Sequence, residues 1–106
     1  MADSAFRTAL LAEAPAFGLT LEPSIVAQFS DHYELLAIWN RKLNLTRIIE
    51  PVEAARFHFL ESALLSKYMV DPAASNGRVV DVGSGAGFPG LPLACVWPDC
   101  EFVLVE

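Results

Sequence analysis

Apolar side chains recur every three or four positions through roughly the first two thirds of the chain, which is the spacing of one face of a helix. We expect a first helix that is capped by Asp3 or Ser4 and ended by Pro15 and Gly18. Its apolar face consists of Phe6, Leu10 and Leu11.

Two further helices are predicted before residue 70. Pro23 suits the first position of the second helix, because the N–H there has no helical partner and proline lacks one. Its apolar stripe, including a tryptophan expected in the core, consists of Ile25, Phe29, Tyr33, Leu36, Trp39 and Leu43. The third helix begins at Pro51 and carries Phe57, Leu60, Leu64 and Leu65.

The last third of the chain changes character. RVVDV, residues 78–82, and EFVLV, residues 101–105, are short apolar runs typical of buried strands. Between them lie a glycine-rich turn, residues 83–87, and a helix from about residue 89 to 97, ended by Pro98. Strand, turn, helix and strand form a βαβ unit, so we expect parallel strands joined by a right-handed connection.

The predicted fold class is therefore α/β. DPAASNG, residues 71–77, is rich in turn residues and separates a helical subdomain, residues 1–70, from the βαβ unit, residues 78–106. A parallel sheet of two strands leaves its faces and edges without cover. We therefore expect the exposed strand edges to drive self-association of this chain.

Composition narrows the class of protein. The chain is 54% hydrophobic with a mean hydropathy of +0.40, yet no apolar run approaches the roughly 18 residues of a membrane span. No signal-peptide pattern opens the sequence, so a cytoplasmic location is expected. Cys95 and Cys100 have the spacing of neither a disulfide framework nor a metal site and are expected to be buried thiols.

The charge is acidic, with a formal net charge of −6 from 13 acidic and 7 basic side chains. This balance argues against the segment as a whole being a nucleic-acid surface, because phosphate contacts come mainly from Lys and Arg. Arg41, Lys42 and Arg47 form the exception. They either contact RNA phosphates or lie near a helix C-terminus, where the macrodipole favours cations.

Two ligand classes fit the glycine turn. Residues 85–90 match G-x-G-x-x-G, the dinucleotide fingerprint of an NAD-type oxidoreductase, and Glu106 falls near the expected ribose-binding acid. However, a pyrophosphate needs free N–H groups at the helix N-terminus, and Pro89 and Pro92 remove two of them.

Residues 81–87 also match D-x-G-x-G-x-G, a pattern that binds S-adenosylmethionine, a cation without phosphate. Glycines let the backbone approach the cofactor, Asp81 orders the turn and offsets its positive charge, and Glu106 accepts both ribose hydroxyls. A tight turn that binds nothing is the remaining interpretation.

Longer motifs resemble one family. They are WNRKLNLT at 39–46, HFLES at 58–62, DVGSGAGFPGLPL at 81–93 and FVLVE at 102–106. Together they closely resemble the RsmG family, also called glucose-inhibited division protein B, which methylates 16S ribosomal RNA of the small ribosomal subunit. The chain differs from the usual motif at Phe57, where the family has Arg, and at Glu61, where it has Asp.

The resemblance implies S-adenosylmethionine as cofactor, and guanine N7 of 16S rRNA as methyl acceptor. Because N7 already carries an in-plane lone pair, no proton has to be removed before methyl transfer. Positioning of the reactants and electrostatic stabilisation are then sufficient for catalysis, and we expect no catalytic base and no metal. The expected cofactor-binding residues are Asp81, Gly83, Ser84, Gly85, Gly87, Phe88 and Glu106, with Gly83 and Phe88 implied by the family.

Two groups upstream of the glycine turn also have predicted roles. His58 and Glu61 either line the cofactor cleft or form a local hydrogen bond on one helix. Asn40, Asn44 and Thr46 are expected to organise the turn between helices through side-chain bonds to backbone.

The resemblance also implies a larger, class I (Rossmann-like) sheet in a longer protein. This chain would hold the helical subdomain and the first βαβ unit, truncated, and would be inactive alone. A fragment of an NAD-type oxidoreductase, or a shortened, non-catalytic chain that binds partners through its helices, remain as alternatives.

Overall fold

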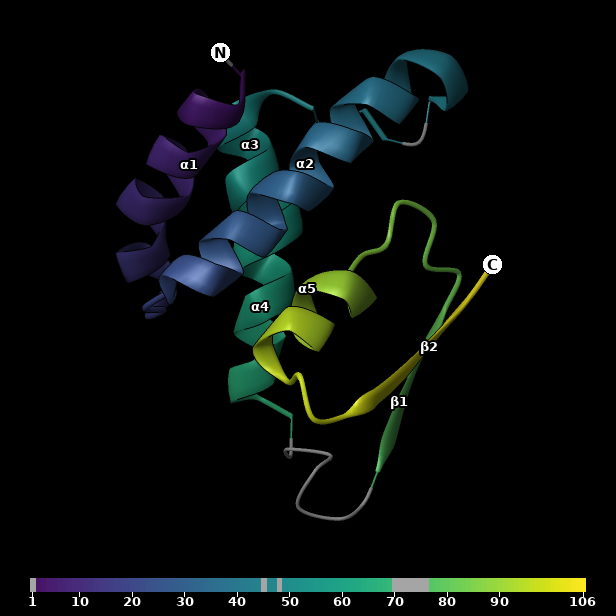
Figure 1. Cartoon of the computed structure of the whole chain (residues 1–106). Helices are drawn as coiled ribbons and strands as arrows, with labels where there is room; N and C mark the ends of the chain where they lie inside the picture. Colours follow the sequence, from purple (N-terminus) through teal and green to yellow (C-terminus); the bar gives the residue numbers. More distant parts are fainter. Residues whose placement is uncertain (1, 45, 48, 70–76) are drawn as a thin grey trace.

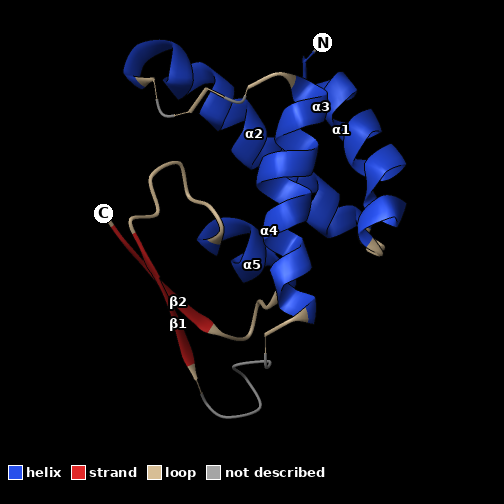
Figure 2. Ribbon diagram, turned by 180° about the vertical axis from the view of Figure 1, so that it is seen from behind, coloured by secondary structure: helices blue, strands red, loops and turns tan. Residues whose placement is uncertain are grey.

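The computed structural model describes residues 2–44, 46–47, 49–69 and 77–106, with only the backbone of residues 2 and 3. The predicted linker lies outside these residues except for Gly77. The described chain contains helices and a two-stranded sheet, so it is a mixed α/β chain (Figures 1 and 2).

The helices form a layer of their own. Its elements are α1 (Ala2–Glu13), a 3-10 turn (Ala14–Phe17), α2 (Pro23–Leu43) and a helical rod made of α3 (Pro51–Ala54), a π-helical segment (Ala55–Leu60), α4 (Glu61–Leu64) and a 3-10 turn (Leu65–Lys67). The remaining elements are β1 (Arg78–Val82), α5 (Gly90–Val96) and β2 (Glu101–Val105).

Helix ends largely follow the sequence signals. Pro23 opens α2 as predicted, and Gly18, in the left-handed region at φ 69°, closes the turn after α1. The side chain of Glu50 accepts hydrogen bonds from two amides of α3 and caps it. The predicted cap of the first helix is wrong: α1 begins at Ala2, which places Asp3 and Ser4 inside its first turn.

Aromatic rings form the centre of the helical core. The ring of Phe6 stacks on that of Tyr33, with centroids 4.2 Å apart, and meets Phe59 edge-on at 5.0 Å. Phe29 contacts the same Phe59 ring at 5.3 Å. These rings come from α1, α2 and the π-helical segment, so aromatic packing joins these three elements.

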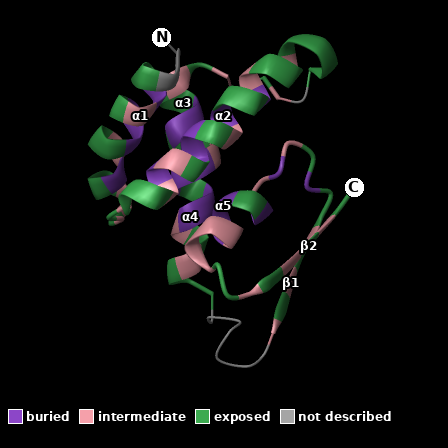
Figure 3. Cartoon of the chain, in the orientation of Figure 1, coloured by how far each residue is buried: buried purple, intermediate pink, exposed green. Residues whose placement is uncertain are grey.

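Several residues predicted to be buried are exposed (Figure 3). On α2, Trp39 is 48% exposed and Leu43 60%, because the last turns of the helix extend beyond the helices that cover its middle. On the rod, alanines and Phe59 face the core, and the small alanine side chains let α1 approach closely. The sequence pattern did not indicate this face, because alanine is only weakly hydrophobic. The other residues that were placed on predicted apolar faces and are exposed are Leu11, Phe57 and Leu65.

The sheet confirms the predicted strand bounds and direction. β1 and β2 are parallel, in a register that runs from Arg78 opposite Glu101 to Val82 opposite Val105. One face packs on α5, which lies between the sheet and the helical layer (Figures 1 and 2). The opposite face exposes Val80, Val82, Val103 and Val105, a surface called here the valine face.

The sequence also predicted that the chain has no membrane-spanning run and that both cysteines are buried. Among the described helices, none is both long and apolar enough to span a membrane. Cys95 and Cys100 are half-buried rather than fully buried thiols, and burial raises the pKa of Cys95.

Candidate functional site

The glycine turn, residues 83–89, connects the end of β1 to the start of α5 beside the C-terminal half of α2 (Figures 1 and 2). Gly83 and Gly85 have positive φ angles of 72° and 54°, and a Cβ at either position would meet nothing within 4 Å. Gly87 is different, because a Cβ there would lie 2.5 Å from Leu91 Cδ1. The turn is therefore packed at Gly87 and open at the other two glycines.

Most amides of the turn are already engaged. Those of Gly83 and Ser84 donate to the carbonyl of Val105 at 2.6 and 3.2 Å, which ties the turn to the end of β2. Among the described residues, the amides of Gly85 and Ala86 donate no hydrogen bond. The open part of the turn thus offers a ligand two backbone donors.

The first turn of α5 offers no such donors. The amide of Gly90 donates to Oδ2 of Asp81 at 2.9 Å. The amides of Leu91 and Leu93 donate to backbone carbonyls, and Pro92 has no N–H. A pyrophosphate would find none of the free amides that it needs at a helix N-terminus.

The ring of Phe88 stacks with two imidazoles. Its ring is nearly parallel to His32, with centroids 4.7 Å apart, and to His58, with centroids 4.5 Å apart. Phe59 meets the same ring edge-on at 4.9 Å. The stack joins the glycine turn to α2 and to the π-helical segment.

Sequence reasoning left His32 without a role. Its Nε2–H donates to the carbonyl of Ala86 at 2.9 Å. Burial lowers the pKa of His32, against the opposing effect of this hydrogen bond, and nearby His58 lowers it further. The signal in the sequence was its position beside the apolar stripe of α2, three residues after Phe29 and four before Leu36.

His58 has a partner from the segment after α2. Its Nε2 lies 3.0 Å from the hydroxyl of Thr46, whose amide donates to Oδ1 of Asn40 at 2.8 Å. Asn44 ends α2 in the left-handed conformation at φ 53°. The predicted side-chain bond to backbone is confirmed for Asn40, whereas the hydroxyl of Thr46 contacts the side chain of His58. The side chain of Glu61 is exposed.

A groove of about 260 Å³ lies between α2 and the glycine turn. Residues 84–87 line one side, and Trp39 and His32 are among those lining the other. Glu106 is exposed and directly follows β2, whose last carbonyl is bonded to the turn. The expected cofactor-binding residues therefore gather at one end of the sheet, next to this groove.

The expected RNA-contacting residues lie at the C-terminal end of α2 and just after it. Arg41 and Lys42 occupy its last turn, and Arg47 is exposed in the following segment. Lys42 Nζ lies 5.1 Å from the centroid of the Trp39 ring, a cation–π contact. Within the described ranges, no three His, Cys, Asp or Glu side chains are grouped to hold a metal ion.

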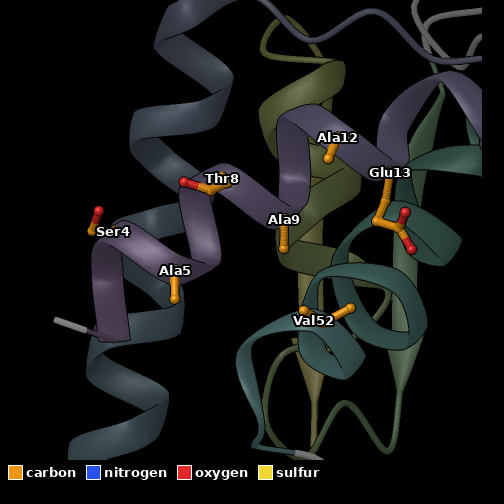
Figure 4. A pocket seen from close by; sticks show the side chains of 7 residues that line it. All are labelled: Ser4, Ala5, Thr8, Ala9, Ala12, Glu13 and Val52. Atoms are coloured by element: carbon orange, nitrogen blue, oxygen red, sulfur yellow. The ribbon is translucent and has the colours of Figure 1, made fainter.

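Another cavity, of about 570 Å³, has no lining residue in the glycine turn or the strands (Figure 4). It lies along a stripe of small side chains on α1, and carries no cluster of chemically reactive groups. Its lining residues are Ser4, Ala5, Thr8, Ala9, Ala12, Glu13 and Val52.

Helices packed against a parallel βαβ unit, with an open glycine turn at one end of the sheet, define a mixed α/β protein with a candidate small-molecule site. Residues 25–106 match the family model described as GidB, rRNA small subunit methyltransferase G. The chain belongs to this family, as the sequence motifs predicted.

Three relatives are each called ribosomal RNA small subunit methyltransferase G. The chain is 42% identical over 97 residues to that of Caldanaerobacter subterraneus subsp. tengcongensis, covering 92% of this chain and 40% of the relative. It is 41% identical over 97 residues to that of Anaeromyxobacter dehalogenans strain 2CP-1, covering 92% and 43%. For Sorangium cellulosum it is 40% over 91 residues, covering 86% and 38%. The chain thus spans less than half the length of these relatives.

Proposed function

We propose that this chain supplies the cofactor-binding turn of a methyltransferase that transfers a methyl group from S-adenosylmethionine to N7 of a guanine in 16S rRNA. Family membership supports a methyltransferase of small-subunit rRNA. The observation that carries the cofactor assignment is the division of the backbone donors: the amides of Gly85 and Ala86 are open, whereas those of the first turn of α5 are engaged.

The residues present fit this cofactor. Gly83 and Gly85 leave open space on the side where a Cβ would stand, so a ligand can approach their backbone. Glu106 would accept hydrogen bonds from both ribose hydroxyls through its two carboxylate oxygens. Asp81 would act mainly by fixing Gly90 and adding negative charge beside the turn. Phe88 stacks with two imidazoles, so part of its ring is already in contact within the chain.

S-adenosylmethionine, when bound, supplies a methyl group on a positively charged sulfur. The lone pair of guanine N7 forms the new N–C bond, the electrons of the S–C bond remain on sulfur, and the positive charge passes to the base. No proton leaves N7, so this chain's residues need only orient the reactants and exclude water. His32 and His58 accordingly serve as packing partners of the turn, without acting as bases.

We further propose that the βαβ unit begins a class I, Rossmann-like fold and that these 106 residues alone do not transfer methyl groups to rRNA. The parts of the relatives that this chain does not match are longer than the parts that it matches. Methyl transfer by the purified 106-residue chain would contradict this proposal.

The cofactor assignment is tested by titration calorimetry of the chain with S-adenosylhomocysteine and with NADH. S-adenosylhomocysteine should bind and NADH should not, and Glu106→Gln should weaken binding. Glu101→Gln, at the other end of β2, is the matched control and should bind normally. Binding of NADH alone would favour an oxidoreductase, and binding of neither would favour a non-catalytic interaction module.

The reaction is tested in cells. Deleting the gene that encodes this sequence should remove one 7-methylguanine from 16S rRNA, detected by mass spectrometry of nuclease fragments. An unchanged set of modified nucleotides would contradict the proposed substrate.

A further inference from the structure

Trp39 combines exposure with a position at the candidate site. The side chain is large and apolar, and 48% of it is accessible to solvent. It also lines the groove whose opposite wall is formed by residues 84–87 of the glycine turn. Core packing therefore does not account for a tryptophan at this position.

The cations near the C-terminal end of α2 form no ion pair with a carboxylate of the described residues. Elsewhere Arg56 pairs with Glu13 at 3.2 Å and Arg78 with Glu101 at 3.1 Å. Within the described part of the chain, no carboxylate forms an ion pair with Arg41, Lys42 or Arg47. Uncompensated positive charge thus collects near the C-terminal end of α2, although the chain carries a net charge of −6.

The helix macrodipole explains only part of this arrangement. It favours Arg41 and Lys42 on the last turn of α2. It does not explain an exposed indole that contacts Lys42 and lines the groove beside the glycine turn. One turn or more earlier on the same helix, exposed Asp31 and Glu34 make the surface acidic. An anionic ligand would therefore be attracted to the last turns of α2 and repelled by the earlier ones.

We propose that Trp39 is a stacking platform for an unpaired base of single-stranded RNA whose phosphates contact Arg41 and Lys42. Proteins bind single-stranded RNA by combining exposed aromatic rings, on which bases stack, with cations that contact the backbone. A peptide partner would not require an indole combined with cations that form no ion pair among the described residues.

The position of the platform suits chemistry on a base. Many enzymes that modify a base take it out of its stack, and a second aromatic surface compensates for the lost stacking. A base on Trp39 lies at the groove that the glycine turn also lines. This inference rests on the proposed function, because it identifies how the rRNA substrate enters the same site.

The chain contains two tryptophans, so Trp97→Phe leaves Trp39 as the only indole. This variant is titrated with an unlabelled, single-stranded RNA of about ten nucleotides that has a central guanine. Saturable quenching of the Trp39 emission is the expected result. The same RNA annealed to its complement should quench weakly, because its bases are already stacked.

Affinity is measured separately by anisotropy of end-labelled RNA. Trp39→Ala should weaken binding about tenfold or more, and Trp39→Phe should retain most of it because a ring remains. Arg41→Gln combined with Lys42→Gln should reduce both the affinity and its salt dependence. Leu43→Ala, at another exposed apolar residue of the same helix end, is the matched control and should leave binding unchanged.

Calorimetry with S-adenosylhomocysteine separates this inference from the proposed function. Normal cofactor binding by the parent chain, together with RNA binding that Trp39→Ala loses and Trp39→Phe retains, supports the platform, and circular dichroism confirms that Trp39→Ala is folded. Normal cofactor binding by the parent chain without quenching, or equal RNA affinity of Trp39→Ala and its parent, overturns the platform alone. Loss of cofactor binding in the parent chain contradicts the proposed function itself.

Discussion

His32 Nε2–H and the carbonyl oxygen of Ala86 lie 2.9 Å apart and join α2 to the glycine turn. His32 therefore holds the turn through one hydrogen bond and one ring face, the latter stacked on Phe88. Removing both contacts with His32→Ala should lower the free energy of unfolding by about 1–3 kcal/mol. His32→Phe keeps a ring and should cost less, and urea denaturation of the two variants measures the difference.

The depressed pKa of His32 predicts a pH dependence of stability. Since its folded-state pKa lies below the ordinary value of 6.5, the unfolded chain binds more protons as the pH falls below about 6.5. The contribution of His32 to the free energy of unfolding is thus complete above pH 6.5 and is lost as the pH falls through the folded-state pKa.

Denaturation curves between pH 7.5 and 5 check this sign, with His32→Phe as the comparison. The parent chain should lose more stability than the variant over that range. An equal loss in both proteins would assign the pH dependence to other groups.

Two glycines of the turn should respond differently to alanine. At Gly87 a Cβ would clash with Leu91 and φ is 99°, so Gly87→Ala should cost about 2 kcal/mol or more. At Gly85 the space is open, so Gly85→Ala should cost only about 1 kcal/mol of stability through backbone strain. Its main effect should be to weaken ligand binding, because the new methyl group occupies that space. Thermal unfolding and S-adenosylhomocysteine titration of both variants distinguish stability from binding. A larger stability loss at Gly85 would contradict this assignment.

Asp81 should be needed for the start of α5. Asp81→Ala leaves the Gly90 amide without its carboxylate acceptor and should lower stability by about 1–3 kcal/mol. Asp81→Asn retains a carbonyl oxygen at the same place and should recover a large part of this loss. If both variants unfold alike in urea, the charge rather than the hydrogen bond is the important feature.

The valine face and the strand edges should cause self-association. Val82 is 78% exposed at the end of β1, and its side chain continues an apolar surface over both strands. Val82→Lys should shift the sedimentation coefficient toward that of a monomer. A parent chain that is already monomeric at high concentration would rule out the association.

Local signals predicted most of the element bounds, because prolines, glycines and apolar runs act within a few residues. Pro23, the strands and the end of the first helix were predicted in this way. Long-range packing was less accessible: Trp39 follows the helical stripe, but the helices that cover the middle of α2 do not reach it. The π-helical segment likewise exposes Phe57 and buries Phe59, a choice that spacing alone could not reveal.

For the candidate site, the glycines and acids were identified from their spacing, and the structure places them together at one end of the sheet. The two histidines were harder to interpret. His32 and His58 belong to different helices, and each becomes a partner of Phe88 only through the tertiary fold. Sequence separation hides such a stack, since no single motif contains its three rings.

The stacking of Phe88 with these imidazoles limits how far the glycine motif can be transferred to other proteins. Its glycines permit the bend, but side chains from two earlier helices hold it in place. Grafting residues 81–93 onto another strand–helix pair would transfer the sequence of the motif without the side chains that pack on Phe88. A design that places this turn in a new scaffold must therefore also include two helices whose side chains pack on its aromatic ring.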